Sequence, residues 1–167
     1  MKGMVFTEFL QMVEDRFSAV MVDDIIDDAN LPSGGAYTSV GTYDHIELVT
    51  LVNALSKRTG LPVSQLIETF GQYVFQVFAR NFTVFFDGVT DALTFLESVE
   101  NIIHPEVLKL YPDATLPNFE CIRNNNELVM VYHSELHLAD LEEGLIIGCG
   151  QFFGNQLIIS REALNDA

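Results

Sequence analysis

Basic side chains are scarce in this sequence, in which eight Lys and Arg stand against 24 Asp and Glu among 167 residues. The resulting formal net charge of −16 repels polyanions and therefore argues against nucleic acid and anionic lipid as partners. Solvated acidic faces, or a basic protein partner, explain this charge better.

Cysteine and tryptophan are also in short supply. Cys121 and Cys149 are the two cysteines, and their wide spacing provides neither a disulfide framework nor a zinc site. Free thiols are typical of a reducing compartment. Because Trp is absent, the 13 Phe residues and the leucines must fill the bulky core positions.

Long hydrophobic runs are missing as well. The opening MKGMVFTEFLQMVEDRF places acidic side chains inside the apolar pattern, whereas a signal peptide needs an uninterrupted apolar stretch. No segment approaches the roughly 20 apolar residues that cross a bilayer. We therefore expect a cytoplasmic protein without membrane insertion.

The sequence also lacks the common catalytic motifs. It contains no G-x-S-x-G elbow, no phosphate-binding loop and no G-x-G-x-x-G. The DDIIDD segment at 23–28 offers paired carboxylates that suit Mg²⁺. Enzymes with such a motif need a second cluster and a larger helical cavity, so a solvated helix face is the better interpretation. We expect that the protein is not an enzyme.

Apolar residues make up 49% of the chain, enough for one domain with a substantial core. Their helical spacing predicts helices at about 5–17, 22–29, 44–59, 63–80, 90–103 and 138–153. Asp44 is a candidate N-cap, and Gly60 a candidate helix end. The segment 31–43 is rich in Pro, Gly and Ser, which indicates a loop.

The second part of the chain contains β-rich stretches. Residues 119–123 and 127–134 flank an Asn-Asn-Asn sequence that predicts a hairpin, and 156–160 predicts a further strand. Helices followed by a hairpin and a packed helix indicate an α+β fold with a small antiparallel sheet.

His104 is followed directly by Pro105. Proline cannot donate its amide and clashes with the preceding helical turn. Either the helix kinks here, or a new helix begins with Pro105 in its first turn. In both cases His104 stands at a defined break, and histidine is a common haem ligand. The C-x-x-C-H attachment for covalent haem is absent, so any haem would be held by an axial ligand and packing.

Several segments together resemble the H-NOX (haem nitric oxide/oxygen binding) family of bacterial stand-alone sensors, related to the haem domain of soluble guanylate cyclase. They are the start MKG, FGQYVF at 70–75, IHPEVLKLYPDATLP at 103–117, YHS at 132–134 and ADLEEGLIIG at 139–148. The resemblance covers essentially the whole chain. It implies a single domain over 1–167, with haem b between a helical distal part (about 1–62) and a proximal part (about 63–167).

The resemblance also assigns site residues. His104 matches the proximal iron ligand, and Pro117 matches the proline that presses against the porphyrin. Tyr132 and Ser134 match the first two members of the Y-x-S-x-R motif that holds the haem propionates. Leu136 stands where the motif has Arg, and Leu cannot make the charge-assisted bonds of a guanidinium. This departure predicts weaker haem retention or a pocket without haem.

The distal side is apolar by the same alignment. The positions that line the gas pocket are Val5, Phe9, Val74, Phe78 and Leu141. Oxygen-holding members of the family have Tyr where Leu141 stands. An apolar pocket gives no hydrogen bond to bound O₂, so we expect NO, and possible CO binding, with O₂ disfavoured. The five residues are equally consistent with an ordinary core.

The resemblance implies that NO binding to ferrous haem releases His104 and shifts its helix, with the haem relaxing against Pro117. The signal would pass to a separate partner, such as a sensor histidine kinase or a cyclic-di-GMP enzyme. The alternative is a haem-free or weakly haem-binding protein-interaction module, which Leu136 favours.

Overall fold

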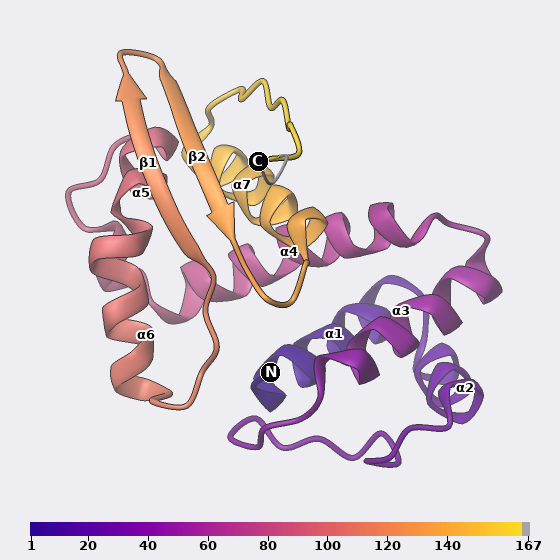
Figure 1. Cartoon of the computed structure of the whole chain (residues 1–167). Helices are drawn as coiled ribbons and strands as arrows, with labels where there is room; N and C mark the ends of the chain where they lie inside the picture. Colours follow the sequence, from indigo (N-terminus) through magenta and orange to yellow (C-terminus); the bar gives the residue numbers. More distant parts are fainter. Residues whose placement is uncertain (165–167) are drawn as a thin grey trace.

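The computed structural model of the chain describes residues 1–164 and shows a mostly helical protein with a β-hairpin (Figure 1). The segments before the hairpin are α1 (Gly3–Arg16), α2 (Ala19–Ala29), α3 (His45–Thr59), α4 (Val63–Asn81), the 3₁₀ turn η1 (Thr83–Phe86), α5 (Ala92–Ser98), the π-helical η2 (Val99–Ile103) and α6 (His104–Leu110). Strands β1 (Asn118–Asn124) and β2 (Glu127–His133) and helix α7 (Ala139–Phe153) follow. The predicted α+β class is confirmed.

Local capping explains where several helices begin and end. Asp44 accepts a hydrogen bond from the Ile46 amide at 2.9 Å, and Ser18 accepts one from the Met21 amide at 3.0 Å. Both side chains satisfy amides that have no partner in the first helical turn. Gly60 ends α3 with a φ of +73°, a conformation that glycine adopts without strain. The predicted cap at Asp44 and helix end at Gly60 are confirmed.

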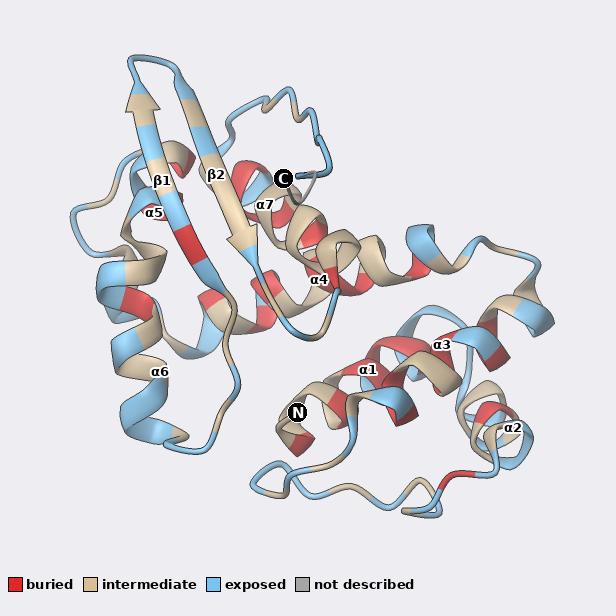
Figure 2. Cartoon of the chain, in the orientation of Figure 1, coloured by how far each residue is buried: buried red, intermediate tan, exposed pale blue. Residues whose placement is uncertain are grey.

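Two hydrophobic clusters form the core. The first joins α1, α2 and α3 to the N-terminal half of α4, and the second joins the C-terminal half of α4 to α5 and α7. Phe70 belongs to the first cluster and Phe75 to the second. Figure 2 shows the buried residues in red along α1, α3, α4 and α7. Helix α4 therefore contributes to both clusters.

Helices α4 and α7 approach each other closely at two glycines. A Cβ atom on Gly71 would lie 2.3 Å from the Leu141 carbonyl oxygen, and one on Gly144 would lie 2.1 Å from the Glu68 carbonyl oxygen. No side chain fits between backbones at this distance, so both positions require glycine.

The helical run before the hairpin changes its pitch at His104. The His104 amide bonds to the Val99 carbonyl in a π-helical turn, and α6 begins at His104 with Pro105 in its first turn. Of the two alternatives for Pro105, the structure shows the new helix. The wider π turn accommodates a residue without an amide hydrogen, and such turns are frequent at functional sites.

Strands β1 and β2 pair antiparallel, with Phe119 opposite Tyr132 and Asn124 opposite Glu127. The turn between them contains Asn125 with a φ of +52°, which Asn tolerates better than most residues. The predicted hairpin is confirmed. Within residues 1–164, no helix is long and apolar enough to cross a membrane.

The predicted strand at 156–160 is wrong, because these residues have no strand conformation. The Asn155 amide bonds to the Gly150 carbonyl, and the Asn155 side chain accepts from the Ala92 amide at 2.9 Å. Leu157 then packs against the second cluster. The segment is thus turned back onto α5 and α7, and only part of its apolar pattern is buried, since Ile158 is 98% exposed.

Candidate functional site

His104 lies where η2 ends and α6 begins, beside the hairpin. Its side chain is 14% exposed, and its ring centroid is 5.8 Å from that of Phe119 in β1. The preceding residue, Ile103, is buried in the second cluster, which anchors the backbone at this point. The imidazole is therefore mostly shielded from solvent, and its backbone is held in place by the packing of Ile103.

Glu100 orients the His104 ring. One Glu100 carboxylate oxygen is 3.3 Å from Nδ1 of His104. An imidazole that donates from Nδ1 to a carboxylate keeps the lone pair of Nε2 for a metal. Burial lowers the pKa of His104, and Glu100 opposes this effect. Neutral imidazole is the form that binds iron, so this chemistry fits an axial haem ligand.

Phe119 brings the other predicted proximal residues together. Its ring centroid lies 5.8 Å from that of His104 and 5.7 Å from that of Tyr132, so Phe119 is a neighbour of both rings. Pro117 is half-buried and stands directly before β1. The structure therefore places His104 and Tyr132 beside the buried Phe119 side chain, with Pro117 two residues before it in the sequence.

Tyr132 and Ser134 keep hydroxyl groups that can donate. Burial raises the pKa of Tyr132, so its phenol stays protonated near neutral pH. The Ser134 hydroxyl oxygen accepts from the Leu136 amide at 3.1 Å, which leaves its hydrogen for an acceptor such as a carboxylate. Leu136 is half-buried, and its side chain has no donor.

Four of the five predicted distal residues belong to the first cluster. Phe9 is fully buried, and Val5, Val74 and Leu141 pack against the cluster. Phe78 instead packs against the second cluster, one turn along α4 from Val74.

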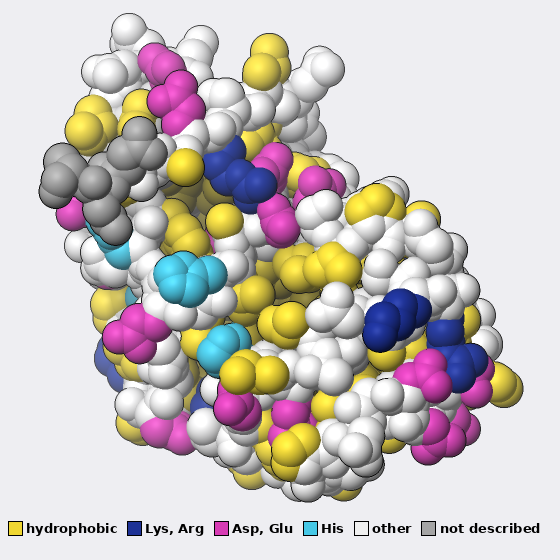
Figure 3. All heavy atoms as spheres, turned by 45° about the vertical axis from the view of Figure 1, so that its right-hand side comes forward, with side chains coloured by type: hydrophobic (Ala, Val, Ile, Leu, Met, Phe, Trp, Pro, Cys, Tyr) yellow, Lys and Arg dark blue, Asp and Glu magenta, His cyan; other side chains and the backbone are white. Residues whose placement is uncertain are grey.

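Two hollows lie near these helices. A small gap between α3, α4 and the start of α7 is lined by apolar side chains alone: Leu48, Val49, Val52, Ile67, Phe70, Leu138 and Leu141. A wider, open groove between α1 and α4 is lined mainly by polar side chains and includes none of the predicted site residues. Figure 3 shows a recess floored by hydrophobic side chains, with histidine side chains at its edge. The apolar gap includes Leu141 but none of the other four predicted distal residues, so the predicted gas pocket stays a prediction.

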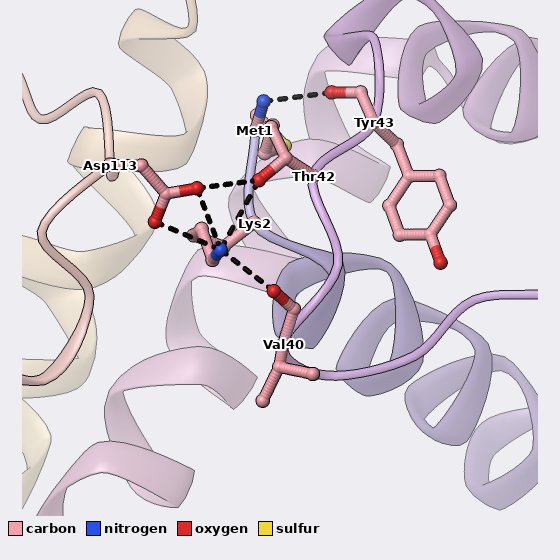
Figure 4. Close-up of polar contacts among 6 residues, drawn as sticks. All are labelled: Met1, Lys2, Val40, Thr42, Tyr43 and Asp113. Atoms are coloured by element: carbon pink, nitrogen blue, oxygen red, sulfur yellow. Dashed lines mark hydrogen bonds and ion pairs between the residues drawn. The ribbon is translucent and has the colours of Figure 1, made fainter.

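A polar network ties the N-terminal helices to the loop that leads from α6 to Pro117 (Figure 4). Lys2 Nζ lies 3.1 Å from each carboxylate oxygen of Asp113 and 2.8 Å from the Val40 carbonyl oxygen. The Thr42 hydroxyl donates to Asp113 at 2.9 Å. These bonds hold the pKa of the Asp113 carboxyl below its usual range. Lys2 and Thr42 thereby connect the N-terminal part of the chain to the loop that carries Asp113.

The acidic segment of α2 is engaged in ion pairs. Arg58 of α3 bonds to Asp24 at 2.7 Å and to Asp28 at 2.6 Å. Over the part of the chain that the structure describes, no group of three His, Cys, Asp or Glu side chains is placed to hold a metal ion. The segment therefore joins α2 to α3.

Sequence reasoning missed Glu100 and Phe119. Glu100 lies four residues before His104, a spacing that places two side chains on one helix face, so an acidic residue there was a readable signal. The contact with Phe119 depends on how the hairpin packs, and local sequence carries no sign of it.

The chain is similar to known proteins over nearly its whole length. The profile of the haem-NO-binding family matches residues 2–161. The unliganded Fe(II) H-NOX protein of K. algicida is 38% identical over 92% of this chain and 84% of that one, with a TM-score of 0.85. The H-NOX protein of S. oneidensis in its Fe(II)NO state is 27% identical over 98% and 91%, with a TM-score of 0.89.

A third similar structure is the H-NOX of Shewanella woodyi, bound to IWP-051 in the Fe(II)CO state. It is 38% identical over 97% of this chain and 86% of that one, with a TM-score of 0.83. The comparison with curated proteins gave no match. The order of helices, hairpin and packed C-terminal helix is therefore that of an established fold.

Proposed function

The chain belongs to the haem-NO-binding family, and on that premise we propose that it is a haem-based sensor of nitric oxide with His104 as the iron ligand. Haem iron is the cofactor of this family, and H-NOX domains are sensor domains rather than enzymes. The environment of His104 carries the proposal: a mostly buried imidazole, with the Glu100 carboxylate 3.3 Å from Nδ1, keeps Nε2 for a metal.

When bound, b-type haem would supply a ferrous iron that binds a diatomic gas. Tyr132 and Ser134 would donate hydrogen bonds to its propionates, and Pro117 would pack against the porphyrin. Leu136 contributes no bond where the family motif has Arg. Each lost bond of this class costs about 1.5–3 kcal/mol, offset by water at an exposed propionate. We therefore expect noncovalent haem that is held less firmly than a complete motif would hold it.

Val5, Phe9, Val74, Phe78 and Leu141 give the distal side an apolar lining. None of these side chains can donate a hydrogen bond, and bound O₂ depends on such a donor more than NO or CO does. The protein therefore selects NO, with CO as a second ligand, and disfavours O₂.

His104 transmits the signal because it begins α6. With haem bound, His104 would tie the first residue of α6 to the iron, so a change in that bond on NO binding would give α6 two positions relative to the hairpin for a partner to distinguish. The partner is a separate cytoplasmic signalling protein, such as a sensor histidine kinase or a cyclic-di-GMP enzyme. The distal part spans about 1–62 and the proximal part about 63–167 of a single domain.

The first test is the absorption spectrum of the protein purified with haem available, then reduced and exposed to NO. Wild-type protein should show a Soret band that moves to the five-coordinate NO position. His104→Gly, expressed without added imidazole, should lose the Soret band because the axial bond is gone. An unchanged spectrum in this variant would remove His104 from the role of ligand.

His137→Gly is the matched control. His137 is exposed and has a φ of +50°, a conformation that glycine adopts freely. This variant removes a histidine without straining the backbone, and its Soret band should equal that of the wild type.

A second function is favoured by Leu136 alone. Without the motif Arg, the chain could keep the fold as a protein-interaction module that binds haem weakly or not at all. Wild-type protein that stays colourless with added haem would establish this alternative and reject the sensor.

A further inference from the structure

We propose that Glu100 is a positioning residue that fixes the orientation and donor strength of His104 and links it to the start of β1. This inference rests on the proposed function, in which His104 holds the iron. It assigns a role to a residue outside the proximal ligand, the propionate motif and the distal lining.

Glu100 contacts two elements at once. From η2 its carboxylate reaches Nδ1 of His104 at 3.3 Å. The same oxygen accepts from the Phe119 amide at 2.9 Å, and the other oxygen accepts from the Asn118 side-chain amide at 2.8 Å. Both oxygens of the carboxylate therefore have a donor from β1.

The bonds from β1 make this carboxylate a fixed reference for the imidazole. Glu100 is 27% exposed and His104 14% exposed, so water screens their interaction less than it would on an open surface. A carboxylate held by two strand donors cannot rotate freely. The position of the charge beside Nδ1 of His104 is thus set by the strand that begins next to Pro117.

The bond also changes the ligand itself. A carboxylate that accepts from one imidazole nitrogen raises the basicity of the other and strengthens its bond to a metal. Glu100 therefore opposes the departure of His104 from the iron. Without the bond to iron, the same contact would keep His104 next to β1, so a displacement of α6 would be passed to the strand.

The test is resonance Raman spectroscopy of the reduced, haem-loaded protein, which reports the iron–histidine stretching band. Glu100→Gln removes the charge and nearly preserves the shape, so the band should shift to lower frequency. A residue that only supported the fold would change thermal stability and leave this frequency in place. Glu106→Gln is the matched control, because Glu106 carries the same charge two residues from His104 but pairs with Lys109. Its band should equal that of the wild type.

Asn118→Ala provides a second, milder variant in case Glu100→Gln does not fold. It loosens the carboxylate without removing it, and a smaller downshift or a broadened band is expected. An unchanged band in both Glu100→Gln and Asn118→Ala, with the band lost in His104→Gly, would overturn the role of Glu100 and leave the proposed function intact. A band that persists in His104→Gly would instead reject the proposed function and this inference with it.

Discussion

At the scale of single residues, the carboxyl groups of Glu100 and Glu142 have different surroundings: Glu100 has donors beside it, whereas burial dominates at Glu142. Glu100 has partners on each oxygen. Glu142, in the first turn of α7, is partly buried, and burial raises its pKa to about 7. Glu142 also lies close enough to Tyr132 to contribute to the raised pKa of that phenol. The proximal side of the site therefore holds a carboxyl group that can carry a proton near neutral pH.

Glu142 predicts a pH dependence of stability. Its carboxyl loses the proton near pH 4.5 when ordinary and near pH 7 in the folded protein, so between these values the folded state binds the extra proton. The free energy of unfolding should therefore fall as pH rises through this window and stay level above it. Denaturant unfolding of Glu142→Gln should lack this fall.

At pH 8 the Glu142→Gln variant should have a free energy of unfolding about 1–2 kcal/mol higher than the wild type. This is less than the full pKa shift of Glu142 would give, because the side chain keeps contact with water. Glu135→Gln removes one charge from an exposed position and serves as the control. An undiminished slope between pH 4.5 and 7 in Glu142→Gln would show that another group causes it.

Part of the site could be predicted from sequence at this scale. His104, Pro117, Tyr132 and Ser134 stand out through spacing that a family shares, and the structure places His104 and Tyr132 beside Phe119. Their roles toward haem stay predictions. Glu100 belongs to no motif, and its importance depends on a strand donor at Phe119, which only the packed structure supplies.

At the scale of elements, the helices followed from amphipathic spacing because burying one face is what stabilises each of them. The strand expected at 156–160 is absent because Asn155 turns the chain back onto α7, and the segment pairs with neither strand of the hairpin. The π turn before His104 was not predictable, since Pro105 is compatible with either a kink or a new helix.

The contact between α4 and α7 predicts a strong effect of one methyl group. Gly144→Ala would place Cβ 2.1 Å from the Glu68 carbonyl oxygen, and backbone cannot yield as a flexible side chain can. The helix propensity of Ala favours the variant by about 0.5–1 kcal/mol, but we expect the clash to win, with a net loss of about 1–3 kcal/mol. The loss of stability is measured as the difference between the denaturant midpoints of Gly144→Ala and the wild type.

Gly150→Ala is the control on the same helix. There the new Cβ would meet Leu157 Cδ1 at 2.9 Å and the Asn155 carbonyl oxygen at 3.1 Å, a less close approach to backbone than at Gly144, so the loss should be smaller. A midpoint for Gly144→Ala no lower than that for Gly150→Ala would contradict the close helix contact.

At the scale of the whole molecule, polar contacts between distant parts of the chain add to the packing of the two hydrophobic clusters. Lys2 and Asp113 are 111 positions apart in the sequence, yet their bond joins α1 to the loop before Pro117. A pairing at this separation leaves no local sign in the sequence. Asp113 is 62% exposed, so the ion pair itself adds little stability, and its value lies in fixing where the loop runs.

The position of α4 in both hydrophobic clusters has a thermodynamic consequence. Phe70 and Phe75 lie on one continuous helix, so neither cluster can lose its packing while the other keeps an intact α4. We therefore expect cooperative unfolding in a single transition. Circular dichroism should give the same midpoint as tyrosine fluorescence, which reports mainly on the first cluster through Tyr37 and Tyr43. Two separated midpoints would mean that the distal and proximal halves melt as independent units.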